Sequence, residues 1–164
     1  MELKGQVSLE LIMIIGFILI LILGIASFLG TDNELNQVMS AARSGAIEGA
    51  NTDSFAIYPE ETFKNYTIEH MRLLNPSSVK IIKIDYTNQG FDEKYNKTKI
   101  QLRISASAPS VTDISDRNVL GDRVNFYVRK SICGSFSTFN QTNDLFNPAF
   151  SNRYVLTTTD VTWI

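Results

Sequence analysis

The sequence of 164 residues is poor in the residues that build metal centres and disulfides. It has one cysteine, Cys133, and one histidine, His70. A single cysteine cannot form a disulfide within the chain, and His70 has no second histidine or cysteine at the spacing of zinc ligands. We therefore expect no zinc site, and we expect Cys133 to be a small buried hydrophobic residue rather than a link between chains.

The sequence also lacks an excess of charge of one sign and the common catalytic motifs. It has 15 Lys and Arg against 17 Asp and Glu, without a basic patch that could follow a phosphate backbone. Nucleic acid is therefore not an expected partner. Neither a Gly-rich phosphate loop nor a G-x-S-x-G nucleophile elbow occurs. These absences favour a protein that is not an enzyme and that needs no cofactor.

Two short segments offer weaker alternatives. Cys133-Gly134-Ser135 resembles a fragment of a cysteine protease motif, but its flanking residues do not match. Asp113, Asp116 and Asp122 fall close together in a predicted loop and offer carboxylates for calcium, without the spacing of an EF-hand. Solvated loop carboxylates are the favoured interpretation.

One long apolar run dominates the N-terminal part of the chain. Leu11–Leu29 contains no charged residue, and Gly16 and Gly24 are among its few weakly apolar members. As a helix it would span roughly 28 Å, close to the thickness of the hydrocarbon core of a bilayer. The run is long for a cleaved secretory signal, and Ala26-Ser27-Phe28 is a poor cleavage site. It predicts a membrane-length helix, and Lys4 weakly favours a cytoplasmic N-terminus.

Helical spacing continues beyond this run. The apolar stripe consists of Leu35, Val38, Met39, Ala42, Ala46 and Ile47, opposite Asn36, Arg43 and Ser44. Gly45 and Gly49 weaken a helix but let another backbone approach closely. We expect one helix over about Ser8–Gly49, apolar on all sides in residues 6–30 and amphipathic in residues 31–50.

The remaining residues, 51–164, have the pattern of a small β-rich head. Apolar and polar residues alternate in 79–86, in 98–108 and in 124–132, and β-forming residues return in 154–159 and 161–164. These patterns predict half-buried antiparallel strands joined by hairpins, with a turn at Asn88-Gln89-Gly90. The predicted fold is therefore α+β: a long hydrophobic N-terminal helix, then an antiparallel β-rich head, either a sandwich or one sheet packed on the helix.

Two segments of the head have a less regular pattern. Residues 58–75 begin with Pro59-Glu60-Glu61, a good helix start, and stay ambiguous between helix and turn. Residues 135–152, polar with regularly placed Phe, predict a long loop over the sheet. The eight aromatic residues from Phe126 to Trp163 are mostly expected in the core. An aromatic surface strip for adhesion is the less favoured alternative.

The residues at the start of the apolar run indicate whether the helix is a simple membrane anchor or has another role. Glu10 places a carboxylate at the edge of an apolar helix, where it is costly in lipid and needs a partner. A permanent anchor has no use for this charge. If the chain were cut after Gly5, Glu10 would be the fifth residue of a new helix. Its carboxylate could then pair with a new amino terminus, on its own chain or a neighbour, and would favour the positive end of the helix.

This pattern resembles the class III signal peptide of archaeal type IV pilins, in which Gln-x-Ser-x-Glu follows the cleavage site. The matching residues are Lys4, Gly5, Gln6, Ser8 and Glu10. The family usually has Leu four residues after the Glu, and this chain has Ile14 there. The motif resemblance covers Lys4–Leu29, and the rest of the chain resembles the family only in shape. Archaellins, which tend to have small residues and glycines after the leader, fit less well.

The resemblance implies a structural subunit and its partners. A prepilin peptidase would remove residues 1–5, cutting between Gly5 and Gln6, from a precursor held in the cytoplasmic membrane. With a pilus assembly ATPase and a membrane platform protein, the helices would then leave the lipid and form a homopolymer, an adhesive filament at the archaeal cell surface. Gly16 and Gly24, eight residues apart near one face, either allow close helix packing or are merely tolerated in a membrane span.

Three sequons suit an outer surface and predict N-glycosylation at Asn65, Asn96 and Asn140. The competing hypothesis is a membrane-anchored extracellular binding domain, held by an uncleaved N-terminal signal anchor. An exported enzyme ranks far behind both. Glu10 in its Gln-x-Ser-x-Glu setting favours the polymerising subunit over the anchored binding domain.

Overall fold

The structure, a computed structural model, describes residues 3–52, 79–109 and 111–164, without the side chains of 3–8 and 27–32. The chain divides into two units, Met1–Asn36 and Gln37–Ile164, called here the first and the second unit. Residues 58–75 lie outside the described residues, and with them the sequon at Asn65 and His70.

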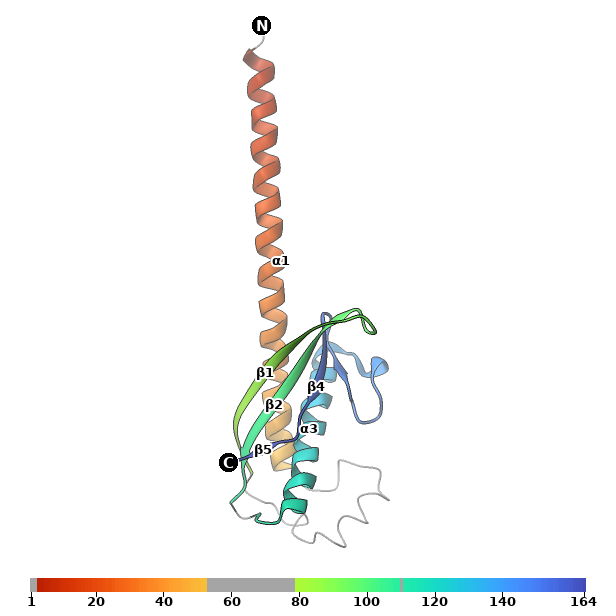
Figure 1. The fold of residues 1–164 in the computed structure, drawn as a ribbon. Coiled ribbons are helices and arrows are strands. Elements are labelled where there is room, and N and C mark those ends of the chain that lie inside the picture. Colours follow the sequence, from red (N-terminus) through yellow and green to blue (C-terminus); the bar gives the residue numbers. More distant parts are fainter. Residues whose placement is uncertain (1–2, 53–78, 110) are drawn as a thin grey trace. The chain divides into compact units, whose positions relative to one another are not determined.

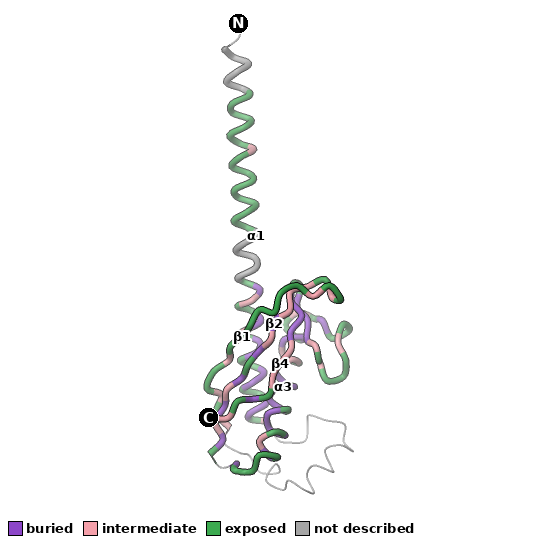
Figure 2. Tube along the Cα trace, in the orientation of Figure 1, coloured by how far each residue is buried: buried purple, intermediate pink, exposed green. Residues whose placement is uncertain are grey.

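Helix α1 (Leu3–Asn51) begins in the first unit and ends in the second, which confirms the helix predicted over about Ser8–Gly49. In the first unit its segment Leu9–Ala26 is long and apolar enough to cross a membrane. The residues of this segment are exposed, apart from Gly16, whose exposure is intermediate (Figure 2). The predicted apolar N-terminal helix is therefore confirmed.

The described strands of the second unit form one mixed sheet in the order β1-β2-β4-β3. β1 (Lys80–Asp92) pairs antiparallel with β2 (Lys97–Ser107), and β4 (Tyr154–Thr158) runs parallel to β2 on the other side. β3 (Ala149–Phe150) pairs antiparallel with β4, and β5 (Thr162–Trp163) runs parallel to β2. The prediction of a purely antiparallel sheet is wrong, because the chain returns from the end of β2 through a helix before it forms β4.

That helix is α3 (Ile114–Phe136), and the strand predicted at 124–132 is therefore wrong. Asp113 caps its start, since its carboxylate accepts hydrogen bonds from the backbone N–H groups of Ser115 and Asp116. Residues 124–128 are all buried, so the alternation of apolar residues does not separate a core face from a solvent face there. A helix buried on several sides can carry such a pattern as well as a strand can.

Helix α3 and the last turns of α1 cover one face of the sheet (Figure 1). The inward residues of β2 and its end are those predicted, and all are buried: Ile100, Leu102, Ile104, Ala106 and Ala108. A Cβ atom added at Gly45 would collide with the carbonyl oxygen of Tyr127, and one added at Gly49 would lie 2.9 Å from the Cα atom of Val124. The close backbone approach predicted at these two glycines is confirmed.

The β1–β2 hairpin reverses later than predicted. Asn88-Gln89-Gly90 lies within β1, at a shift of register between Asn88 and Phe91. Gly90 adopts φ 90°, and its N–H donates to the Asn88 Oδ1 atom at 2.8 Å. These residues therefore form an irregularity in the strand, and the chain turns at residues 93–96, where Asn96 has φ 53°.

The segment predicted as one long loop, residues 135–152, is more structured than expected. It contains the end of α3, a short 3-10 helix, η3 (Phe139–Gln141), and strand β3. Of its aromatic residues, Phe150 is buried, whereas Phe139 is 52% exposed. The predicted core position is thus right for Phe150 and wrong for Phe139, which packs edge-on against Phe146 instead.

Candidate functional site

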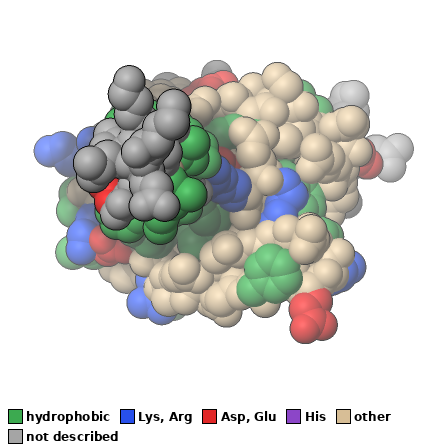
Figure 3. Space-filling model, turned by 90° about the horizontal axis from the view of Figure 1, so that it is seen from above, with side chains coloured by type: hydrophobic (Ala, Val, Ile, Leu, Met, Phe, Trp, Pro, Cys, Tyr) green, Lys and Arg blue, Asp and Glu red, His purple; other side chains and the backbone are tan. Residues whose placement is uncertain are grey.

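The candidate site is the apolar segment Leu9–Ala26 of α1. Its fourteen large apolar side chains are each between 47% and 69% exposed. In the view from above in Figure 3, hydrophobic side chains gather around the N-terminal end of the helix. At about 1.5–3 kcal/mol for each side chain, exposing this set to water costs more than the whole stability of a typical domain. A helix that is apolar on all sides requires a membrane or a bundle of other helices.

Glu10 is the one charged side chain between Lys4 and Asp32. It is exposed, and it has no ion-pair partner within the described part of the chain. An acidic side chain in a membrane helix costs up to about 2.5–3.5 kcal/mol at the bilayer centre and less near the interface. The helix therefore gains from any neighbour that offers this carboxylate a positive charge.

The predicted processing residues lie in the first two turns of α1. The backbone of Lys4, Gly5, Gln6 and Ser8 is helical from Leu3 onward. The first backbone N–H groups of a helix have no partner within the helix, so its first turn opens at little cost. The peptide bond between Gly5 and Gln6 is thus in the part of α1 that a peptidase can unwind most easily.

Gly16 and Gly24 each leave a gap in the side-chain surface of the apolar segment. No atom lies within 4 Å of a Cβ atom added at either glycine. Neither glycine is therefore required by packing within the described residues. Such positions let a second helix approach the backbone closely, which is how helices associate inside a bilayer.

The two described sequons are accessible. Asn96 lies exposed in the β1–β2 turn, and Asn140 lies exposed in η3. The Thr142 hydroxyl of the second sequon donates to the carbonyl oxygen of Pro148 at 2.6 Å. Both asparagine side chains have room for a bulky modification on the surface of the second unit.

No known protein family, curated protein or solved structure matches the chain.

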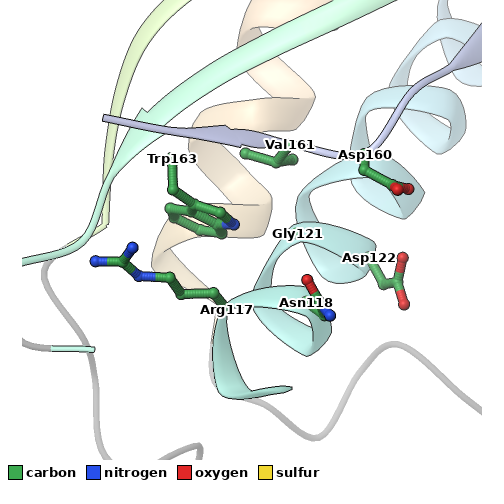
Figure 4. Close-up of a pocket in the computed structure, with 7 residues that line it drawn as sticks. All are labelled: Arg117, Asn118, Gly121, Asp122, Asp160, Val161 and Trp163. Atoms are coloured by element: carbon green, nitrogen blue, oxygen red, sulfur yellow. The ribbon is translucent and has the colours of Figure 1, made fainter. Parts of the chain in front are cut away.

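A polar hollow of about 210 Å³ lies between α3 and the C-terminal residues of the second unit. Figure 4 shows Arg117 beside the ring of Trp163, with the carboxylates of Asp122 and Asp160 on the other side. The Arg117 Nε atom donates to the Val111 carbonyl oxygen at 2.8 Å. The hollow is smaller than the roughly 300–1,000 Å³ of most small-molecule sites.

The three aspartates weighed as calcium ligands do not share a loop. Asp113 caps α3, Asp116 is buried on that helix, and Asp122 lies further along it at the hollow. Among the residues described, no group of three His, Cys, Asp or Glu side chains could hold a metal ion. Cys133 is fully buried, which confirms its predicted role as a small core residue.

One feature that the sequence did not predict is an open groove on the second unit between α1 and β1. Two adjoining hollows form it, and we call them together the α1–β1 groove. Its lining residues are Met39, Ser40, Arg43 and Ile47 from α1, and Ile81, Ile82, Lys83 and Ile84 from β1. The sequence signal for this groove is the adjacent pair Ile81 and Ile82, which breaks the alternation of the strand. The pair lies at a shift of register between Ile81 and Lys83.

Proposed function

We propose that this chain is a structural subunit of an archaeal type IV pilus-like surface filament. The observation that carries the proposal is the exposed apolar segment Leu9–Ala26, which contains the single charge of Glu10 near its start. It belongs to the same helix as Val38, Ala42 and Ala46, which are buried in the second unit. The Gln6-x-Ser8-x-Glu10 motif supports it from the sequence.

In this proposal the precursor waits in the cytoplasmic membrane, held by the apolar segment. A prepilin peptidase removes residues 1–5, and the helices then leave the lipid for the centre of a homopolymer. Lipid and neighbouring helices are about equally apolar, so this transfer has little hydrophobic driving force. Two features then favour the filament over the lipid. Helices pack closely at Gly16 and Gly24, and a partner for Glu10 fixes the register between neighbouring helices.

The second unit would form the outer surface of the filament. Its accessible Asn96 and Asn140 are candidates for N-glycosylation there. Adhesion is the role we assign to the filament, with a pilus assembly ATPase and a membrane platform protein as assembly partners. We assign no enzymatic activity to either unit.

The proposal is tested by Glu10→Ala in cells that export the full chain. Membrane insertion should persist, because the apolar segment is unchanged, whereas the yield of sheared extracellular filaments should fall by about tenfold or more, which corresponds to about 1.4 kcal/mol. Glu48→Ala is the matched control, since Glu48 is an exposed glutamate on the same helix. Normal filament yield from Glu10→Ala would refute the role given to this carboxylate and favour a permanent anchor.

A further inference from the structure

The α1–β1 groove is an open depression on the second unit, lined by aliphatic side chains together with Ser40, Arg43 and Lys83. Its two hollows have volumes of about 210 Å³ and about 270 Å³ and share Arg43 and Ile84, so they form one continuous depression. Ile47 and Ile82 line it and are 47% and 53% exposed. Each hollow suits one or two aliphatic side chains.

The α1 side of this groove is a helical stripe. Met39, Arg43 and Ile47 are four residues apart and therefore lie one above the other on the same face of α1. The prediction that Arg43 lies opposite the apolar stripe is therefore wrong. A second helix packs along such a stripe by placing its own residues at four-residue spacing into the hollows. The groove thus fits the side of a helix that runs along α1.

Arg43 lines both hollows and therefore lies at the centre of the groove. It is exposed, and it has no ion-pair partner among the described residues. The other cation of the groove, Lys83, is paired with Asp85 at 2.8 Å. An arginine next to apolar surface suits a carboxylate best, because its planar guanidinium can donate two parallel hydrogen bonds.

We propose that the α1–β1 groove receives the apolar segment of a second copy of this chain, with Glu10 of one copy paired with Arg43 of the other. This inference rests on the proposed function. Glu10 is the one charge of the apolar segment Leu9–Ala26, and Arg43 lines the groove without an ion-pair partner among the described residues. The two surfaces are therefore complementary in charge, and both carry exposed aliphatic side chains.

The proposal fixes a register between the two helices. With parallel helices and Glu10 opposite Arg43, Ile14 lies opposite Ile47, and both are four residues further along their helices. Ile14 then fills the hollow formed by Ile47, Ile81 and Ile82. Contacting copies are staggered by roughly 50 Å along the helix direction, at 1.5 Å per residue.

Cleavage after Gly5 would create a new amino terminus at Gln6, which is a second positive charge that could pair with Glu10. The two partners respond differently to a charge exchange, because Arg43 can be replaced and the amino group cannot. We therefore compare sheared-filament yields of Glu10→Arg, Arg43→Glu and the double variant in the full chain. Each single variant should lose about tenfold or more, and the double variant should return to within about threefold of the unchanged chain.

Arg103→Glu is the matched control, because Arg103 is an exposed arginine on β2 outside the groove, and its filament yield should stay unchanged. The mature N-terminus of each variant is checked, because Glu10 lies near the cleavage site. Normal assembly of Arg43→Glu, or a double variant as poor as Glu10→Arg, would overturn the pairing. If the unchanged chain makes no filaments at all, the proposed function itself fails, and the two failures are thereby distinguished.

A second measurement does not depend on charge. A chain carrying Ile14→Cys and Ile47→Cys should form ladders of disulfide-linked multimers when filaments are treated with a thiol oxidant. Cys133 is fully buried and does not interfere. The pair Ile14→Cys and Arg103→Cys, with the second cysteine outside the groove, should give no ladder. Ladders from this control alone would place the segment elsewhere on the second unit and contradict the proposal.

Discussion

At the scale of single residues, small size and isolated charge determine what each helix can contact. Gly45 and Gly49 bring the backbone of α1 against α3 inside the second unit, whereas Gly16 and Gly24 have no neighbour within 4 Å of an added Cβ atom. The same residue type therefore has two different uses on one helix. The first pair stabilises a folded unit, and the second pair leaves room for a partner from outside the chain.

This difference predicts opposite results for one substitution at two glycines. Gly45→Ala places a methyl group against the Tyr127 backbone, so we expect the second unit to lose about 1–3 kcal/mol of unfolding free energy. Gly24→Ala should leave that value unchanged. Denaturant unfolding of the full chain in detergent measures it through Trp163, the single tryptophan, which belongs to the second unit. Equal stability of the two variants would contradict the packing described for Gly45.

Single residues predict helix contacts best at two kinds of position. One is a glycine where a larger side chain would not fit, and the other is a charged residue in an apolar segment. The close approach at Gly45 and Gly49 was predicted from the size of glycine in a run rich in alanine. Ile47 belongs to the predicted apolar stripe but is 47% exposed, whereas its neighbour Ala46 is fully buried. Helical spacing defines a face of the helix, but it does not decide which residues at the edge of that face stay covered.

At the scale of elements, alternation alone gave one correct strand and one wrong strand. In β2 the residues between the buried Ile100, Leu102 and Ile104 are partly or fully exposed, so the period of two reflects a real difference between faces. In α3 the intervening Asn125 and Tyr127 are also buried. The helix signal lay further upstream, in the cap at Asp113 and in the spacing of Val119, Leu120 and Val124.

The pairing of strands depended on contacts far apart in the sequence. β1 pairs antiparallel with β2 because a hairpin joins the two strands. The chain reverses direction at residues 93–96 and not at Asn88-Gln89-Gly90. The parallel pairing of β2 with β4 follows from α3, which carries the chain back across the sheet. Once α3 is misassigned as a strand, an antiparallel sheet is the natural but wrong conclusion.

The inward face of β2 gives a prediction at this scale. Leu102→Ala should lower the unfolding free energy of the second unit by about 2–5 kcal/mol, because Leu102 is fully buried between the sheet and the helices. Arg103→Ala, on the opposite face of the same strand, should change it by less than about 0.5 kcal/mol. A similar loss for both variants would mean that the two faces of β2 are equally buried.

At the scale of the whole molecule, the chain joins a unit that needs other molecules to a unit that folds around its own core. The first unit contains an apolar helix segment that no described residue covers, and the second contains a mixed sheet with two helices on one face. A permanent anchor would explain the apolar segment but leaves Glu10 without a role. A polymerising subunit explains both and gives the α1–β1 groove an occupant.

The most direct test of this account is mass spectrometry of the N-terminal peptide, on protein taken from a sheared extracellular filament fraction. The account predicts a mature chain that begins at Gln6 and is abundant in that fraction. Replacing Gly5 by a bulky residue is the control, and it should leave the leader in place and the protein in the membrane. An intact Met1, with the protein found in membranes alone, would contradict the account and identify the helix as a permanent anchor.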